Sequence, residues 1–229
     1  SLREEYETEA IKVHVIGFAK VMGDIRDGAL NVIFFFCVTI VVTALLVWFY
    51  SQSFLFSILP MGCSLAAVAW QLGIIHLMGF GIDPMSILVP FLVFAIGVSH
   101  GVQMVRVFRD QLFHGEEASV AARKAFSELL IPGGVALLTD TIGFITILLI
   151  PVPTIRELAI AASVGVAAII VTNLILLPLL LSYQKPSHEY RERVAKRKVK
   201  TKKFWHKVSV VSERRIAKGL VVIGALLFV

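Results

Sequence analysis

The stretch Leu88–Val107, LVPFLVFAIGVSHGVQMVRV, is apolar almost throughout but carries Ser99, His100 and Gln103 near its middle. A hydrocarbon core about 30 Å thick is crossed by roughly 20 apolar residues in helical conformation. The stretch therefore has the length of a membrane span. Membrane helices that keep polar groups at this depth generally use them for function.

The composition of the whole chain agrees with a membrane protein. Among its 229 residues 57% are hydrophobic, and the mean hydropathy of +0.84 far exceeds that of a soluble globular domain. The sequence predicts an all-α polytopic membrane protein with five complete spans and the start of a sixth. We place them at Ala29–Tyr50, Ser53–Met78, Met85–Val107, Leu129–Ile150 and Leu158–Leu181, with Leu220–Val229 beginning the sixth.

The sequence divides into four parts. Residues 1–27 are polar, and Ile11–Gly17 alternates like a strand, so we expect the end of an extramembrane domain in this part; a plain amphipathic lead-in is the alternative. Residues 28–182 hold the five spans, 183–215 form a basic linker and 216–229 begin the next span. Because the chain starts at Ser1 and stops at Val229 inside an apolar run, we expect a fragment of a longer protein.

The charges predict the orientation. Thirteen Lys or Arg residues lie between Tyr183 and Lys218, and the positive-inside rule places this segment in the cytoplasm. Counting back through five spans places residues 1–27 on the outer side. Aromatic and aliphatic residues interleave with the lysines, so we expect residues 185–215 to contact anionic lipid head groups rather than nucleic acid. A solvated linker is the alternative.

The two cysteines, Cys37 and Cys63, both lie inside apolar spans. In such positions cysteine usually packs as a small hydrophobic residue. The sequence therefore predicts neither a metal site nor a cofactor.

Two ionisable residues lie near the middle of spans, His100 and Asp140. A carboxylate at that depth costs about 2.5–3.5 kcal/mol on insertion scales, so Asp140 must be protonated, paired or hydrated. Histidine is its natural partner because an imidazole ordinarily titrates near neutral pH. Counted from Leu88 and Leu129, the two residues are expected at the same depth of antiparallel spans. Spacing does not show whether they face each other.

Small and hydroxyl-bearing residues surround this pair. Gly97 and Gly101 bracket Ser99 and His100, and small residues four apart let another helix approach. Gly133 lies seven residues before Asp140 and shares its face. The predicted helix-packing positions are Gly97, Gly101, Gly133 and Gly134, and the predicted supporting polar residues are Gln103, Thr139 and Thr141.

These motifs, in this order, resemble the resistance-nodulation-division superfamily, more narrowly its MMPL-like and hydrophobe-exporter branches, whose five-span block is related to sterol-sensing domains. The resemblance rests on Ala95–Gln103, Ala136–Phe144 and Pro151–Ala159 and covers roughly Val15 to Leu181. It implies that residues 1–27 end a periplasmic porter domain. It also implies that the five spans are the second to sixth of a twelve-span protein in the bacterial inner membrane.

This sequence departs from the superfamily at one point. In the superfamily the third of these spans usually carries one or two aspartates that relay protons, and in this chain Ser99 and His100 stand in those places. We hypothesise that Asp140 supplies the acid from the neighbouring helix. The resulting prediction is a non-enzymatic, proton-motive-force-driven exporter of lipids or hydrophobic small molecules, with His100, Asp140 and Ser99 as proton relay. A homo-oligomer, dimer or trimer, is expected.

Two other function classes remain open. A sensing or scaffolding bundle would bind a lipid between spans without pumping, and Asp140→Asn would leave its function intact. An intramembrane hydrolase would use Ser99 with His100. Adjacent helix positions point about 100° apart, which disfavours a nucleophile–base pair.

Overall fold

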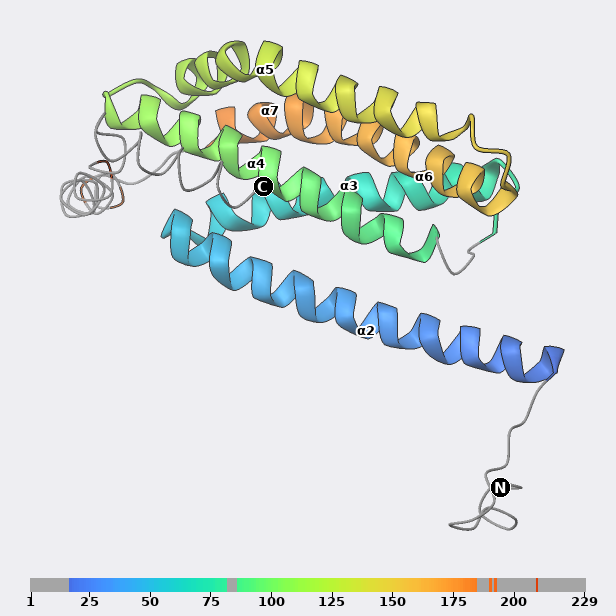
Figure 1. Ribbon diagram of the computed structural model, residues 1–229. Coiled ribbons are helices and arrows are strands. Elements are labelled where there is room, and N and C mark those ends of the chain that lie inside the picture. The colour runs from blue at the N-terminus through green and yellow to red at the C-terminus, as the bar shows by residue number, and fades with distance from the viewer. Residues whose placement is uncertain (1–16, 82–85, 185–189, 191, 193–208, 210–229) are drawn as a thin grey trace, which may run out of the picture.

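The computed structural model describes residues 17–81 and 86–184, together with 190, 192 and 209. Within these residues, five helical stretches are long and apolar enough to cross a membrane. They lie side by side as an all-helical bundle (Figure 1). The predicted all-α polytopic fold with five spans is confirmed, and the chain is a multi-pass membrane protein.

The first span, α2, runs from Phe18 to Ser51 and is much longer than the predicted Ala29–Tyr50. Its 34 residues extend about 51 Å, well beyond a hydrocarbon core of about 30 Å. Residues 18–27, which the sequence predicted to belong to the end of an extramembrane domain, form the first turns of α2. Residues 1–16 lie outside the described residues. The helix ends at Gln52, whose left-handed backbone, φ 56°, reverses the chain.

The second span, α3, runs from Phe54 to Leu77 and matches its predicted bounds to within one residue at each end. Buried serines join it to the end of α2. The hydroxyl groups of Ser51 and Ser57 lie 2.6 Å apart, and each lies within hydrogen-bond distance of the Ser53 carbonyl oxygen, at 2.9 Å. The tight turn makes α2 and α3 antiparallel neighbours at this end (Figure 1).

The third and fourth spans extend into what the sequence indicated as a polar connector, Arg106–Ser127. A short 3₁₀ turn, η1 (Ser86–Leu88), leads into α4, which runs from Val89 to Phe113; α5 runs from Ala118 to Ile147. Only four residues separate α4 from α5, and Gly115 in that turn has φ 90°. The charged residues continue the helices because a helix satisfies its own backbone and water solvates the side chains at its ends.

The fifth span is continuous but irregular. Helix α6 (Pro153–Ile169) passes into a π-helical segment, η2 (Ile170–Leu176), and then into α7 (Leu177–Ser182). The backbone N–H of Leu177 bonds to the carbonyl of Thr172, five residues earlier. Pro178 lacks an N–H and so cannot continue a regular ladder, which accounts for the wide turn before it.

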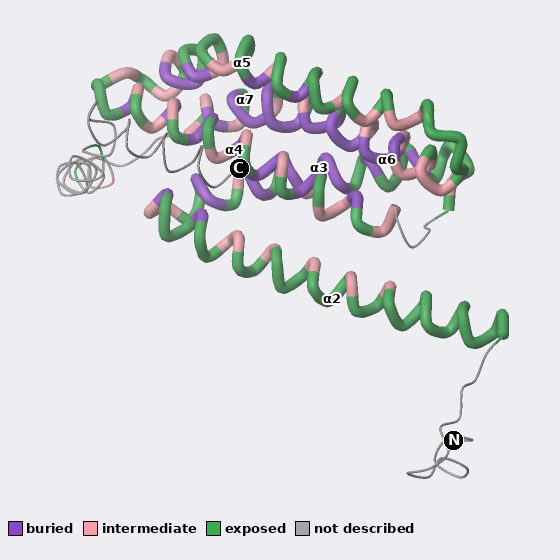
Figure 2. The backbone as a smooth tube through the Cα atoms, in the orientation of Figure 1, coloured by how far each residue is buried: buried purple, intermediate pink, exposed green. Residues whose placement is uncertain are grey.

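The core lies between α3, α4 and the fifth span. One cluster includes Val93, Phe94, Leu137, Val166 and Ile169, and a second, nearer the α4–α5 turn, includes Phe56, Met104, Phe108, Leu177 and Leu181. Figure 2 shows the buried positions concentrated on these helices, whereas α2 is exposed along most of its length. The exposed faces of α2 and α5 are rich in large apolar side chains, as lipid-facing surfaces are.

Helix α2 touches the core through aromatic contacts. Phe36 packs against Phe91 and Phe94 of α4, with ring centroids 4.8 and 5.7 Å apart. Cys63 is buried in the second cluster and Cys37 is exposed on α2; both thiols are free.

Candidate functional site

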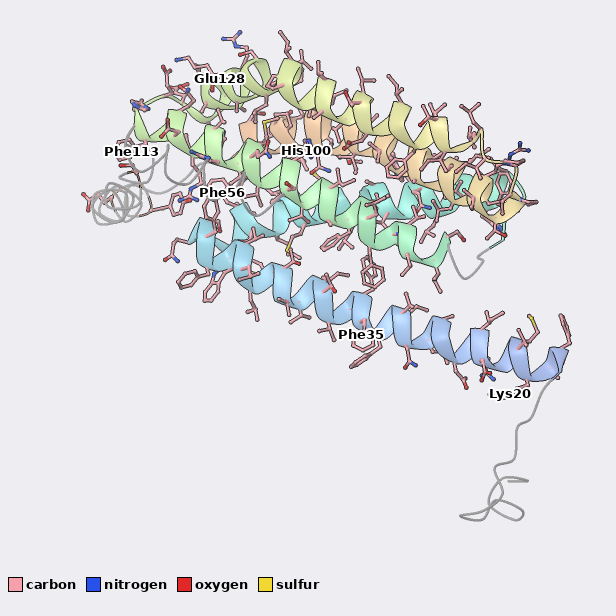
Figure 3. All side chains as sticks on the ribbon, viewed as in Figure 1. Lys20, Phe35, Phe56, His100, Phe113 and Glu128 are labelled. Atoms are coloured by element: carbon pink, nitrogen blue, oxygen red, sulfur yellow. The ribbon has the colours of Figure 1, made fainter. Side chains whose placement is uncertain are left out.

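The polar side chains in the middle of α4 lie partly on its exposed face and partly against neighbouring helices. Ser99 and Gln103 are exposed, His100 is half-buried, and Gly97 and Gly101 are buried against neighbouring helices. Figure 3 labels His100 at the centre of α4. Because hydrocarbon does not solvate a hydroxyl or an amide, the exposed face of α4 requires water or further protein against it.

The imidazole of His100 has a defined hydrogen-bond arrangement. Its Nδ1 lies 3.0 Å from the carbonyl oxygen of Ile96, one turn earlier on α4. A carbonyl oxygen only accepts, so Nδ1 must carry the hydrogen, and in the neutral ring Nε2 is left with a lone pair. Among the described residues Nε2 has no hydrogen-bond partner. The site therefore holds a nitrogen that is free to take up a proton.

The neighbour of this ring on α5 is Gly133. A Cβ placed on Gly133 would lie 3.9 Å from Cδ2 of His100 and 3.2 Å from Cδ1 of Leu174. Gly134 is also near Leu174, at 3.8 Å. His100, Gly133 and Leu174 thus meet at one level, where α4, α5 and η2 come together.

Asp140 lies elsewhere on α5. It is exposed, it forms no hydrogen bond or ion pair with any described residue, and it follows Gly133 by seven residues, or about 10 Å along the helix. The equal depth expected for His100 and Asp140 is therefore not observed. The expectation counted residues from the ends of the apolar runs. The relative level of two residues on neighbouring helices depends instead on how those helices are shifted along each other.

The threonines beside Asp140 do not bond to it. Thr139 donates from Oγ1 to the carbonyl of Val135, and Thr141 to that of Leu137, both at 2.8 Å. A hydroxyl has one hydrogen, and each of these is used on its own helix. In this arrangement neither threonine stabilises a carboxylate at position 140.

The glycines of α4 lie at close helix contacts. A Cβ on Gly97 would fall 2.8 Å from Oγ of Ser64 and 3.3 Å from Nδ2 of Asn173. On Gly101 it would fall 2.6 Å from Cβ of Pro60 and 2.9 Å from Oδ1 of Asn173. Both positions therefore need glycine for α3 and η2 to approach α4 as closely as they do.

A buried polar group beside these glycines was not singled out by sequence reasoning. We define the Asn173 cluster as Ser64, Thr172 and Asn173 together with Gly97 and Gly101. The three polar residues are at most 1% exposed, and Oδ1 of Asn173 has no hydrogen-bond partner within the described part of the chain. An asparagine inside the apolar stretch Leu158–Leu181 was the available signal.

A second buried amide lies further along α3. Gln71 is 1% exposed and its Oε1 is also without a partner among the described residues. Its Cγ lies 3.2 Å from the position of a Cβ on Gly165, and Val93 lies closer still to that position. Gln71 follows Ser64 by seven residues, so it lies about 10 Å from the Asn173 cluster along α3.

A tyrosine and an arginine meet at the end of the bundle nearest the basic linker. Tyr190 donates from its hydroxyl to the carbonyl of Ser51 at 3.0 Å and stacks on Phe56, with ring centroids 5.3 Å apart. The guanidinium of Arg109 lies over the rings of Tyr50 and Tyr190, at 5.7 and 6.0 Å. Burial raises the pKa of Tyr190, and the charge of Arg109 partly offsets this.

No group of three or more His, Cys, Asp or Glu side chains that could hold a metal occurs among the described residues. The basic residues 193–208 and the start of the predicted sixth span lie outside them, so the expected lipid contacts there stay predictions.

Comparison with known proteins gives three results. No solved structure matches the chain. A membrane protein of Methanocaldococcus jannaschii is 25% identical over 136 residues, which are 58% of this chain and 34% of that protein. This chain therefore spans about a third of the length of that relative. The model of the MMPL family matches residues 1–218. With a match over nearly its whole length, and with the five spans in place, this chain belongs to the MMPL family.

Proposed function

We propose that this chain is the membrane part of a proton-motive-force-driven exporter, in which His100 takes up and releases the coupled proton. The cargo would be a lipid or a hydrophobic small molecule, and the protein would work in a bacterial inner membrane as a dimer or trimer. Membership of the MMPL family supports the class of transporter. The assignment of the proton to His100 comes from the site.

One observation carries the proposal: an imidazole at mid-span whose Nε2 is a vacant proton acceptor. The bond from Nδ1 to the Ile96 carbonyl fixes the tautomer, and the ring sits at the meeting point of three helical segments. A charge that appears there changes the packing of all three, because a cation in an apolar bundle needs new hydrogen-bond partners. Protonation and helix movement are coupled in this way.

Asp140 takes part in the proposal as a second proton site. Its carboxylate lies about 10 Å further along α5 than the level of His100, so exchange between them runs through water or through protein beyond the described residues. Protonation of Asp140 would neutralise its carboxylate and remove most of the free-energy cost of placing that group in a membrane span. Ser99 and Gln103, on the exposed face of α4, would support such water.

Proton flux in proteoliposomes tests the proposal. The full-length protein is reconstituted with a pH-sensitive dye inside, and an imposed pH gradient is followed for wild type, His100→Gln and His76→Gln. His76 is an exposed histidine in the last turn of α3 and serves as the matched control. We expect His100→Gln to abolish protein-dependent flux and His76→Gln to retain it. Unchanged flux in His100→Gln would reject a mechanism in which His100 carries the coupled proton.

The sensing bundle is the second candidate, favoured by the close packing at Gly97 and Gly101. It predicts that no variant at His100 or Asp140 alters flux, because no protein-dependent flux exists. Under the proposal the chain also has no hydrolase activity, so Ser99 should not be labelled by a serine-reactive phosphonate.

A further inference from the structure

The Asn173 cluster contains an acceptor that its neighbours cannot satisfy. Ser64 donates from its hydroxyl to the carbonyl of Pro60 at 2.7 Å, and Thr172 donates to that of Ala168 at 3.1 Å. Nδ2 of Asn173 donates to Oγ1 of Thr172 at 3.2 Å. Both hydroxyl hydrogens are thus in use, and none remains for Oδ1 of Asn173. Exchanging the amide oxygen and nitrogen would not help, because Thr172 would still have no hydrogen to give.

A buried amide oxygen without a hydrogen-bond donor raises the free energy of the folded state. An arrangement in which Oδ1 of Asn173 gains a donor is therefore lower in free energy. The donor must come from outside the cluster. Oδ1 faces Gly101, at 2.9 Å from its Cβ position, and His100 is the preceding residue on α4. The ring of His100 lies beside Gly133, which also contacts Leu174, the residue after Asn173. His100 is next to Gly101 on α4, and Asn173 is next to Leu174 on η2, so the two residues lie at the same level of the bundle.

The needs of these two side chains are complementary. Neutral His100 has no hydrogen on Nε2, and Asn173 then lacks a donor. Protonated His100 has a hydrogen on Nε2 that needs an acceptor. Among the described residues, the buried acceptors without partners are Oδ1 of Asn173 and Oε1 of Gln71, and Gln71 lies about two turns away.

The backbone around Asn173 is suited to a change of position. It lies in the π-helical segment η2, ahead of Pro178, and π-helical turns inside longer helices are commonly found at functional sites. The opposing surface of α4 consists of Gly97 and Gly101, which have no side chains to obstruct movement of the amide. A sideways shift of η2 therefore meets no side chain of α4 at these two positions, where the backbones already lie in close contact.

We propose that Asn173 is a positioning residue that stabilises protonated His100, its Oδ1 accepting the hydrogen that Nε2 gains. The inference rests on the proposed role of His100 as the proton-binding group. It adds a named partner, on the fifth span, through which protonation of α4 moves η2.

Among the described residues, no other ionisable group on the helices around His100 forms a hydrogen bond or ion pair with it. Segments η2 and α7 carry no charged residue. Asp140 is the acid at mid-span on α5, and Cys63 on α3 is buried in the second core cluster. The remaining charged or titratable residues of α3 to α6 lie nearer the helix ends: His76, Arg106, Arg109, Asp110, Arg123, Lys124, Glu128, Arg156 and Glu157.

The pH dependence of His100 modification tests this inference. Diethyl pyrocarbonate reacts with neutral imidazole, and mass spectrometry of the His100 peptide gives the extent of reaction between pH 5 and 9 in full-length protein in nanodiscs. Asn173→Leu removes the acceptor, so the midpoint should move to lower pH by about one unit. Asn173→Asp supplies a carboxylate, and the midpoint should move to higher pH. Gln71→Leu, the matched control, should leave it unchanged.

Opposite shifts from Leu and Asp at one position are not expected of a merely structural role. Leucine has the same branched arrangement of side-chain heavy atoms as asparagine but a larger volume, and it removes the unpaired Oδ1 together with the Nδ2–Thr172 hydrogen bond. A thermal melt of each variant checks that the fold is retained. If His100 shows no midpoint in wild type, the proposed function itself is wrong. If a midpoint exists but neither Asn173 variant moves it, or both move it in the same direction, the role of Asn173 is rejected while the proposed function stands.

Discussion

Gly101 of α4 and Pro60 of α3 are in such close contact that a Cβ on Gly101 would fall 2.6 Å from the Pro60 Cβ. Real Cβ atoms do not approach that closely, and the ring of proline cannot turn away. The contact holds α3 against α4 beside the Asn173 cluster.

Gly101→Ala should destabilise the bundle by about 1–3 kcal/mol, because the methyl group forces the two helices apart. The matched control is Gly62→Ala on α3, where no atom lies within 4 Å of the new methyl group. There the substitution should be neutral or stabilise by about 0.5–1 kcal/mol. Thermal unfolding in nanodiscs measures both. Equal melting temperatures for the two variants would contradict the contact.

Asp140 should react with dicyclohexylcarbodiimide, and reaction should increase as pH falls, because the reagent needs a protonated carboxyl group in an apolar site. If Asp140 and His100 exchange protons, His100→Ala should move the pH at which labelling is half complete. Mass spectrometry of the Asp140 peptide from the full-length protein in lipid gives the profile. If the pH profile of labelling is the same in wild type and in His100→Ala, the two residues do not exchange protons and Asp140 is not part of the relay.

Tyr190 should lose its contact with the bundle only at alkaline pH. Burial raises its pKa above the usual value of about 10, so the neutral hydroxyl is the form that the folded state favours. Its stabilising contribution is fully present below about pH 10 and is lost as pH rises through the raised pKa. The phenolate absorbance of wild type minus that of Tyr190→Phe reports this single group. A midpoint at or below pH 10 would contradict the burial of its hydroxyl against Ser51.

Arg156 should stabilise the C-terminal end of α5. Its Nε donates to the carbonyls of Leu148 and Ile150, at 3.2 and 3.1 Å, just after the helix ends. Arg156→Gln cannot bridge both carbonyls from the same position and should cost about 1 kcal/mol or more. The control is Arg123→Gln on an exposed face of α5, for which we expect less than about 0.5 kcal/mol. Hydrogen exchange of the backbone amides around Leu148 should increase only in the first variant.

The sequence predicted the number, type and order of the spans, because membrane thickness and hydrophobic run length determine them. It predicted α3 almost to the residue, since a serine turn and a glycine turn bound it. It misplaced the ends of α2, α4 and α5, where charged residues continue helices beyond the hydrocarbon. Apolar run length does not report such extensions.

The candidate site was predicted less completely. His100 and the small residues beside it were recognisable as polar and glycine positions in an apolar run. The neighbours of His100 were not, because they depend on the crossing of α4 with α5 and on the π-helical turn. Asn173 shows this most clearly: its type was visible, but its burial against Gly97 and Gly101 follows from packing between segments about 70 residues apart.

Helix α2 has a mechanical consequence. It is a single rod of about 51 Å whose C-terminal half packs on the bundle, from the Ser51–Gln52 turn to the ring of Phe36, while its first turns at Phe18 have no neighbouring helix among the described residues (Figure 1). The part from Phe36 to Phe18 is an unsupported arm of about 27 Å, so a bend of about 5° at Phe36 would carry Phe18 through about 2 Å. A change in the packing of Phe36 against Phe91 and Phe94 would therefore be passed along a rigid arm to the opposite end of the helix.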